Sequence, residues 1–535
     1  MITGNDLIAA GWQPGPGFGK ALDTAIAFYR QEMRAEYTTE EIAKTKALIL
    51  LGAPPTVPEL IGMRSRQVSI ALAIKPEGQL EESNLAACMK TMDEVRQHPM
   101  VEKTALMPDA CPAGPGVCVG GVVMTRNAVI PAMHSADMCC SMNVSFFVPP
   151  IGKSIAQLMG TLENVTHFGI GGRERNDQVD FRPYLAGWKQ LFDGDNPFLQ
   201  GLESRAREFL GTCGDGNHFN YLGKIKITPG MLETLGKTQH FNMAAKLRQI
   251  LGYEVLALVT HFGSRGVGAE VFKRGAKVAR QETEKIAKGI PSWGHWIPKS
   301  SERYQQYWEA VAFIQRWTHR NHNAVRDRFL QVLYPGDTPR PLAEMFNAHN
   351  FVWKWKDIEG GTGDDLIYHG KGATPAWQDE TYGFPLLGAI PLNMAEPILL
   401  VLGEANREFL CMAPHGAGRN MSRTQLLNQA LAGVKVPDWY KVLGGGLTPE
   451  AALKAFRADA ATKMAADQVK GLDIRWFSGK TDLSETPMAY KSAAAVKQQI
   501  KDFALATVWG EIEPLGCIMA GEGAEPPWKT KKAAK

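Results

Sequence analysis

Side chains that can bind metals or phosphates are concentrated in five short loops of the sequence. The loops are DMCC (137–140), GTCGDGNHF (211–219), HFGSRG (261–266), NAHN (347–350) and PHGAGR (414–419). They contain four of the twelve histidines, together with Asp137 and Cys140. One carboxylate, one thiolate and three imidazoles can ligate two divalent cations, and the thiolate of Cys140 is best placed to bridge them.

Each loop is ambiguous when it is taken alone. A histidine beside glycine is more often structural than a ligand, and spacing alone favours Cys139 and Cys140 as two small buried hydrophobic residues. Neither GTCGDGN nor YHGKGAT (368–374) has the spacing of a Walker A phosphate loop. The metal interpretation therefore depends on the five loops as a set.

The segments that must position these loops alternate between strand and helix patterns. We expect strands over 67–76, within 106–148, over 253–262 and within 384–403, and helices over 24–51, with a capping box Thr38-x-x-Glu41, over 303–317 and after Gly444 to Gly446. The strand over 253–262 ends in polar residues, where sites usually form. The sequence predicts an α/β (mixed α+β) fold, a single large body with central β-sheets flanked by helices.

Composition places the chain among globular proteins. The 535 residues are 44% hydrophobic and 21% charged, which excludes a disordered chain, and the net charge of +4 indicates no global attraction to nucleic acid. The eight cysteines are scattered and the N-terminus lacks a signal-peptide pattern. No apolar run reaches about 18 residues, so we expect a cytoplasmic protein that does not bind membranes.

The order and wording of the loops resemble the RtcB-type RNA ligases of tRNA splicing and RNA repair. MPDACPAG (107–114) is similar to the family's MPDVHxG, ADMCCSM (136–142) to DxxCGM, GTCGDGNHF to GTLGxGNHF, and THFGSRGVG (260–268) to HSGSRGLG. NAHNF (347–351), HGKGAT (369–374) and HGAGRNMSR (415–423) match in the same order. The resemblance covers roughly 107–423, whereas the flanking sections match weakly or not at all.

The resemblance implies a role for each matching residue. One metal ion would be held by Asp137, Cys140 and His218, and the second by Cys140, His261 and His349. His415 would be the nucleophile, with Asp109 accepting a hydrogen bond from its other ring nitrogen. The implied nucleotide-binding residues are Asn217, His218, Tyr221, His349, Asn350, Pro391, Asn393, Met394, His415, Gly416, Ala417, Gly418 and Met519. Arg265, Lys371, Arg419 and Arg423 would contact phosphates, with structural ion pairs as the alternative.

The implied reaction begins with attack of His415 on the α-phosphorus of GTP, which gives a histidyl-GMP phosphoramidate. A 2′,3′-cyclic phosphate is opened to a 3′-phosphate, the 3′-phosphate takes up the nucleotide, and a 5′-hydroxyl then displaces it. The implied cofactors are GTP and two Mn²⁺ ions, and a thiolate-bearing site also suits Zn²⁺ or Co²⁺. The expected partners are RNA with such ends, GTP or another nucleoside triphosphate, and an activating protein.

The positions that recognise guanine in the family differ in this chain. The Glu of GNHFxE is Tyr221, the Gly-Ser of PGSM is Leu392-Asn393, a nearby serine falls on about Ile398, and the Lys of PLGVVKG is Met519. One interpretation is a shifted alignment, in which Tyr221 stacks on the base and Lys529, Lys531 or Lys532 replaces the lost lysine. The other is altered nucleotide specificity, because guanine loses its carboxylate partner.

We therefore expect a catalytic core over 101–430. Residues 1–100 would form a weakly matched N-terminal region, 431–520 a section completing the nucleotide pocket, and 521–535 a disordered basic tail. The predicted function is an RNA ligase that joins 3′-phosphate or 2′,3′-cyclic phosphate ends to 5′-hydroxyl ends. The alternatives are a metal-dependent RNA-end phosphohydrolase, a 3′-end capping enzyme with altered nucleotide specificity, and a non-catalytic RNA-end binding protein.

Overall fold

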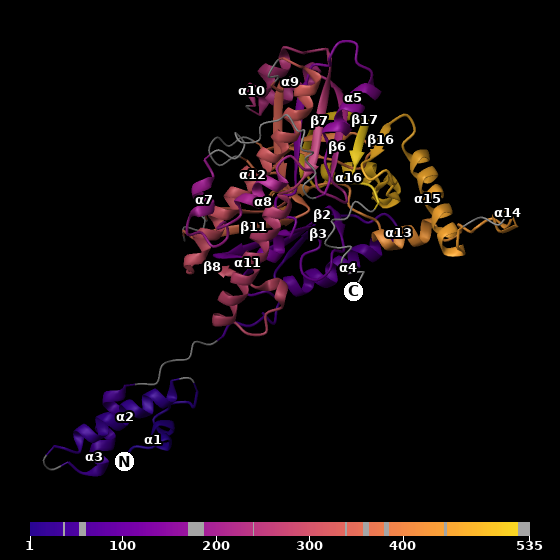
Figure 1. Ribbon diagram of the computed structural model, residues 1–535. Helices are drawn as coiled ribbons and strands as arrows, with labels where there is room; N and C mark the ends of the chain where they lie inside the picture. The colour runs from indigo at the N-terminus through magenta and orange to yellow at the C-terminus, as the bar shows by residue number, and fades with distance from the viewer. Residues whose placement is uncertain are drawn as a thin grey trace. The chain divides into compact units, whose positions relative to one another are not determined.

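The computed structural model describes residues 1–15, 17–35, 38–52, 60–169, 187–238, 240–336, 340–356, 363–378, 385–442 and 447–522 (Figure 1). Contacts divide the chain into two compact units, Met1–Ile61 and Gly62–Lys535. The boundary expected at residue 100, between the N-terminal region and the catalytic core, stays a prediction. The basic tail beyond Glu522, with Lys529, Lys531 and Lys532, and the joint Gly444 to Gly446 lie outside the described residues.

The first unit is helical. It contains α1 (Gly4–Ala9), α2 (Phe18–Glu32) and α3 (Glu40–Leu51), packed around a core that includes Leu7, Ala25 and Ala43. The helical region expected over 24–51 consists of two helices, and the second begins one residue later than the predicted capping box, because Thr39 has an extended backbone and accepts from the amide of Ile42 at 3.3 Å. The cap is therefore Thr39 and not Thr38.

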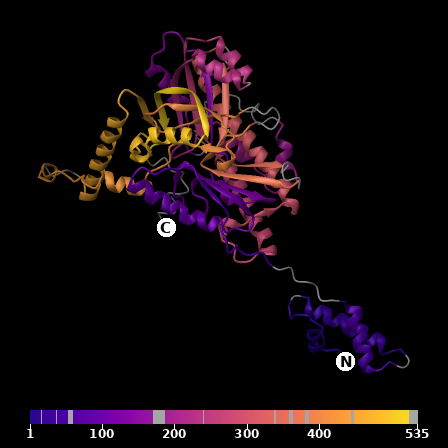
Figure 2. The same cartoon turned by 180° about the vertical axis from the view of Figure 1, so that it is seen from behind.

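An eight-stranded antiparallel sheet is the largest element of the second unit. Its strand order is β13 (Leu387–Ile390), β14 (Ile398–Gly403), β17 (Ala506–Met519), β6 (Phe219–Lys226), β7 (Glu254–Phe262), β5 (Ser141–Phe147) and β9 (Ala343–Ala348), with β16 (Asp473–Trp476) pairing in parallel with β17 off this path. Every residue of β5 and β14 is buried, which explains the unbroken apolar sequence of β14, whereas β5 also buries Ser141, Asn143 and Ser145. The yellow C-terminal strand β17 lies among strands from the middle of the chain (Figure 2).

A second sheet of five strands carries the other half of the site. Its order is β1 (Ile70–Leu72), β2 (Val101–Cys111), β3 (Val119–Arg126), β11 (Asp365–Lys371) and β10 (Asn350–Lys356). The pairing of β2 with β3 shifts between Leu106 and Cys111, so that Asp109 lies outside the regular ladder. Two short pairs complete the strands, β12 (Ala373–Pro375) with β15 (Met412–Pro414), and β4 (Ala128–Val129) with β8 (Ile297–Pro298).

Helices pack against these sheets or extend from them. They are α4 (Gln79–Val95), α5 (Ile155–Val165), α7 (Lys189–Asp193), α8 (Glu203–Phe209), α9 (Pro229–Lys237), α10 (Phe241–Arg248), α11 (Arg265–Ile286), α12 (Glu302–Leu333), α13 (Arg423–Ala430), α14 (Asp438–Val442), α15 (Pro449–Gln468) and α16 (Ala493–Asp502). None of the helices in the described part of the chain combines the length and apolarity required to span a bilayer.

The mixed α/β fold predicted from the sequence is confirmed, with two local corrections in this unit. The strand expected over 67–76 is only Ile70–Leu72. The expected C-terminal helical section contains α15 and α16 but ends in the long strand β17. The sequence of β17 misled the prediction because its Gly510, Pro514 and Gly516 interrupt the apolar pattern, and the strand accommodates them with a register shift between Pro514 and Gly516.

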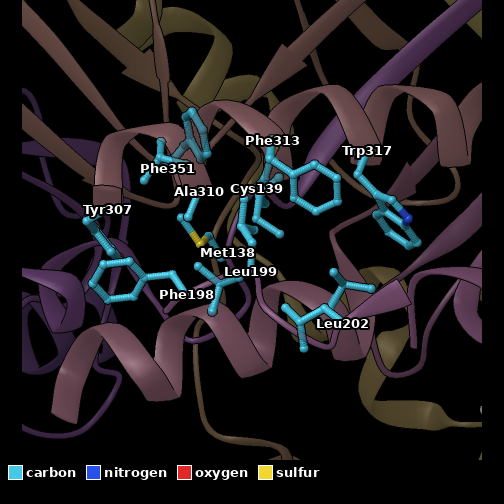
Figure 3. Packing of buried hydrophobic residues seen from close by; sticks show 14 of the residues in the cluster. Met138, Cys139, Phe198, Leu199, Leu202, Tyr307, Ala310, Phe313, Trp317 and Phe351 are labelled. Atoms are coloured by element: carbon cyan, nitrogen blue, oxygen red, sulfur yellow. The ribbon is translucent and has the colours of Figure 1, made fainter. Parts of the chain in front are cut away.

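The core beside the metal-type residues is built on α12. Tyr307, Phe313 and Trp317 are fully buried there and pack with Met138 and Cys139 in one cluster (Figure 3). Burial of each large side chain contributes roughly 1.5–3 kcal/mol. Met138 and Cys139 thus anchor the segment that leads to Cys140.

Candidate active site

Adjacent strand ends bring the five metal-type residues together. Cys140 immediately precedes β5 and His218 immediately precedes β6, whereas His261 lies in β7 opposite both Met142 and Phe219. His349 follows β9, and its amide donates to the carbonyl of Cys140 at 2.9 Å. Because β6, β7, β5 and β9 are neighbours in the sheet, residues from four distant parts of the sequence converge.

The ligand atoms form two groups that share one thiol. Cys140 Sγ lies 3.3 Å from His218 Nε2 and 3.3 Å from His261 Nε2. His261 Nε2 lies 3.1 Å from His349 Nε2, and His218 Nε2 lies 3.3 Å from Asp137 Oδ2. Within each group, Asp137–Cys140–His218 and Cys140–His261–His349, all ligand atoms lie within 4.8 Å of one another. This donor set fits two divalent cations bridged by a thiolate.

Burial sets the protonation of these groups. It holds the pKa of His261 and of His349 well below the usual value, so both imidazoles are neutral and offer a lone pair. Burial and the neighbouring Asp137 carboxylate raise the pKa of the Cys140 thiol well above its usual value. A bound cation would lower the pKa of Cys140 again, because it stabilises the thiolate directly.

The two adjacent cysteines have separate environments. Cys139 has a left-handed backbone, with φ +60°, and belongs to the hydrophobic cluster around α12. Cys140 belongs to both ligand groups. The hydrophobic interpretation of the cysteine pair therefore describes Cys139 and not Cys140.

His218 depends on a close backbone approach. Gly214 has φ +112°, and a Cβ atom at this position would lie 2.1 Å from His218 Nδ1. Any larger residue would displace the histidine ring. The glycine pattern of GTCGDGNHF thus keeps space for His218.

His415 is held by a buried carboxylate. It follows β15, its backbone amide donates to Asp109 Oδ2 at 3.1 Å, and its Nδ1 pairs with the same oxygen and with the carbonyl of Gly372 at 2.8 Å. Asp109 is fully buried, whereas the His415 side chain is 16% exposed. With Nδ1 engaged as a donor, Nε2 is the nitrogen that carries a lone pair for reaction. The His415 and His349 ring centroids are 4.9 Å apart, which places the nucleophile beside the metal-type cluster.

The nucleophile loop packs tightly on the strand that carries Asp109. Gly418 has φ +75°, and a Cβ atom there would lie 2.3 Å from the carbonyl oxygen of Asp109. Asn350 accepts from the amide of Gly372 at 2.7 Å, so it supports the carbonyl that contacts His415.

A cavity of about 160 Å³ opens beside His415. Of the predicted nucleotide-binding residues, its lining includes Asn217, Tyr221, Pro391, Asn393, Met394, His415, Gly416, Ala417, Gly418 and Met519. His218, His349 and Asn350 are not in the lining, since the first two belong to the metal-type cluster and Asn350 acts through Gly372.

The floor of this cavity is apolar. Tyr221 of β6 lies directly opposite Cys517 of β17, and Phe219 directly opposite Met519. The Tyr221 hydroxyl donates to the carbonyl of Ile512 at 3.0 Å, so its ring and not its hydroxyl faces a ligand.

The four predicted phosphate contacts fall into two kinds. Arg265 donates to the carbonyl of Gly169 at 3.0 Å, and Lys371 donates to the carbonyl of Val117 at 2.7 Å, with burial lowering the pKa of Lys371. Both are therefore engaged with backbone. Arg419 lines the cavity, and the Arg423 side chain is 49% exposed near it.

Three residues at the site have no motif signal in the sequence. Glu485 and Tyr490 line the cavity, and the ammonium of Lys491 donates to the carbonyls of Pro108 and Ala110 at 2.8 Å, on either side of Asp109. They lie in LSETPMAYK (483–491), which has no distinctive spacing. Their partners are 60 or more residues away in sequence, so periodicity does not reveal them.

The comparisons with known proteins agree with this architecture. The family model described as tRNA-splicing ligase RtcB matches residues 91–435. The fold and the site thus define a ligase of this class. The chain belongs to the RtcB family, as a divergent member.

Curated relatives show the degree of divergence. The RNA-splicing ligase RtcB of Escherichia coli is 28% identical over 337 residues, which cover 60% of this chain and 74% of the relative. The tRNA-splicing ligase RtcB of Thermococcus kodakarensis is 23% identical over 465 residues, 77% of this chain and 86% of the relative. The RNA-splicing ligase RtcB homolog 1 of Entamoeba histolytica is 22% identical over 480 residues, 81% and 83% of the two chains.

Proposed function

We propose that the protein is an RNA ligase that joins 3′-phosphate or 2′,3′-cyclic phosphate ends to 5′-hydroxyl ends through a nucleotide carried on His415. The observation that carries this proposal is the His415–Asp109 pair, located at a cavity lined by ten of the predicted nucleotide-binding residues and beside a cluster suited to two cations. Family membership supports RNA as the substrate.

In the first step, His415 Nε2 attacks the α-phosphorus of a nucleoside triphosphate. A P–N bond forms, the bond to the β-phosphate oxygen breaks, and pyrophosphate leaves. Asp109 holds the Nδ1 proton and stabilises the positive charge that develops on the ring. Two divalent cations, Mn²⁺ by family resemblance, would be held by Asp137, Cys140, His218, His261 and His349 and would neutralise charge on phosphate oxygens.

In the following steps, the nucleotide moves to the RNA end. An oxygen of the 3′-phosphate attacks the phosphorus on His415, which releases the imidazole and leaves a capped 3′ end. The 5′-hydroxyl of the second RNA then attacks the 3′-phosphate and displaces the nucleoside monophosphate. We propose Arg419 and Arg423 as contacts of these phosphates, because Arg419 lines the cavity and Arg423 is half exposed, and Arg265 and Lys371 as residues that also hold the backbone around them.

The nucleotide expected from the resemblance is GTP, and the apolar cavity floor favours a second candidate with altered base specificity. Tyr221 and Met519 offer a stacking surface, and the Tyr221 hydroxyl is bonded to Ile512. Stacking does not distinguish guanine from adenine as edge hydrogen bonds do. This supports use of other nucleoside triphosphates besides GTP.

Mass spectrometry of the protein incubated with Mn²⁺ and each of the four triphosphates tests both points. We expect a single nucleotide adduct on His415, and its mass identifies the base. RNA with defined ends then measures ligation, which His415→Ala should abolish. Ligation by His415→Ala, or capped 3′ ends without sealing by the native protein, would contradict the proposed ligase.

The proposed location is the cytoplasm, and the proposed role is RNA repair or tRNA splicing. All eight cysteines are free thiols, which supports a reducing compartment. The need for an activating protein stays a prediction.

A further inference from the structure

The segment Ser484 to Lys491 contacts the His415 loop from outside residues 91–435, which match the family model. Arg419 Nη1 donates to the carbonyl of Ser484 at 2.6 Å, and the amide of Lys491 donates to the carbonyl of Gly418 at 3.0 Å. The match to the family model ends at residue 435. We call residues 484–491 the brace.

At the centre of the brace, Glu485 binds two arginines with one oxygen. Its Oε1 lies 2.7 Å from Arg419 Nη2 and 2.6 Å from Arg423 Nη2, and its side chain is 1% exposed. Its Oε2 accepts from the Tyr490 hydroxyl at 2.6 Å. Both carboxylate oxygens are therefore used, and the carboxylate is fixed in one orientation.

Both arginines face functional groups. Arg419 lines the cavity beside His415. The Arg423 guanidinium lies over the loop that leads to His218, since a Cβ atom on Gly216 would be 3.0 Å from Arg423 Nη2. Two guanidinium groups that contact the same carboxylate oxygen repel each other when that anion is removed. Arg423, with 49% of its side chain exposed, is the arginine that can then move into solvent.

We infer that Glu485 is a positioning residue that holds Arg419 and Arg423 as a paired site for a phosphoryl group. The ligand chemistry is a phosphate monoester or polyphosphate, and its two sources are the tail of the nucleoside triphosphate and the 3′-phosphate of RNA. Each guanidinium has five N–H donors, so donors remain for a phosphate after the contacts with Glu485. The inference rests on the proposed function for the identity of these ligands.

Removing the charge of Glu485 changes phosphate affinity in opposite directions under the two main interpretations of its role. If Glu485 positions the arginines, loss of its charge releases Arg423 and weakens phosphate binding. If Glu485 instead competes with phosphate for the arginines, loss of its charge strengthens binding. A purely structural role is largely retained by Gln, which keeps the shape of Glu and its hydrogen-bonding oxygen.

The experiment compares Glu485→Gln, Arg423→Ala and the double variant in the full chain. One arm measures the KM for nucleoside triphosphate in adduct formation. The other measures the affinity for RNA oligonucleotides that end in 3′-phosphate against 3′-hydroxyl. In one of the two arms we expect each single variant to weaken phosphate binding about 10-fold, with kcat changed by no more than about 3-fold. The double variant should bind phosphate as tightly as either single variant, because both changes remove the same contact. The affected arm identifies the source of the phosphate.

Controls keep the outcomes distinct. Glu513→Gln makes the same chemical change at a carboxylate that is 67% exposed and pairs with Lys224 at 3.8 Å, and should leave both arms unchanged. If Glu485→Gln unfolds, Tyr490→Phe removes only the Oε2 contact and should weaken the same arm about 3-fold.

Three results would overturn the inference: tighter binding by Glu485→Gln, unchanged binding by Glu485→Gln while Arg423→Ala weakens it, or additive losses in the double variant. A native protein that forms no adduct would contradict the proposed function instead, and the RNA arm would still decide the role of Glu485.

Discussion

Replacing Asp109 by Asn removes one negative charge from beneath the nucleophile and leaves the ring otherwise supported. The carbonyl of Gly372 still accepts from His415 Nδ1 at 2.8 Å, so the proton stays on Nδ1 and Nε2 keeps its lone pair. The loss is therefore mainly electrostatic. For charge centres about 4 Å apart at an effective dielectric constant of about 20, the lost stabilisation of the developing imidazolium is about 4 kcal/mol. This corresponds to a rate of adduct formation about 10³-fold lower.

A single-turnover assay with a triphosphate labelled at the α-phosphate measures this rate. Asp365→Asn is the matched control, because Asp365 is equally buried and accepts from Tyr304 at 2.8 Å at the far end of β11 from Lys371. The control should lose stability but keep its adduct rate. A loss below about 10-fold for Asp109→Asn would refute the electrostatic argument, since the carboxylate would then only orient the ring.

Three further outcomes follow from the structure. Cys140 belongs to both ligand groups, so Cys140→Ser should remove both metal ions; elemental analysis that finds one ion fully retained would contradict a shared thiolate. Met519→Lys places an ammonium on the cavity floor and should raise the preference for GTP over ATP about 10-fold in adduct formation, because it pairs with the guanine carbonyl and repels the adenine amino group; an unchanged ratio would place the base elsewhere. Burial lowers the pKa of His98 to about 4 and that of His369 to about 3, so the folded state resists protons that the unfolded chain accepts near pH 6.5. This contribution to the free energy of unfolding is fully present above about pH 6.5 and falls as the pH drops towards 4, by about 3 kcal/mol for His98. Denaturant unfolding measured at several pH values should show that the free energy of unfolding depends less on pH in His98→Gln.

The metal-type residues could be singled out from the sequence because they belong to ordered motifs, and the structure brings them together. Asp137, Cys140, His218 and His261 lie at strand ends, where glycine-rich turns follow or precede apolar runs, and the sheet order then brings those ends together. Their roles as ligands stay a prediction, since proximity alone does not identify an ion.

The other residues of the candidate site depend on partners that are distant in the sequence. Arg265 and Lys371 match phosphate-binding motifs, but the sequence does not reveal that each also donates to a backbone carbonyl, Arg265 to Gly169 and Lys371 to Val117. Glu485 was missed for the converse reason, since its importance arises from arginines more than 60 residues earlier in the chain.

The position of β17 has a consequence for synthesis of the protein on the ribosome. β17 joins the β13–β14 pair to the sheet that begins with β6, so until it emerges these are two separate pieces with open edges. About 160 residues separate the end of β9 from the start of β17, or roughly 8–30 s of translation. During that time the nascent chain already contains the strands with the metal-type residues, but it lacks Cys517 and Met519 of the cavity floor. A chain released from a ribosome stalled in this interval would contain the metal-type residues but would lack part of the cavity beside His415. It would also expose an unpaired edge of β6, which favours aggregation.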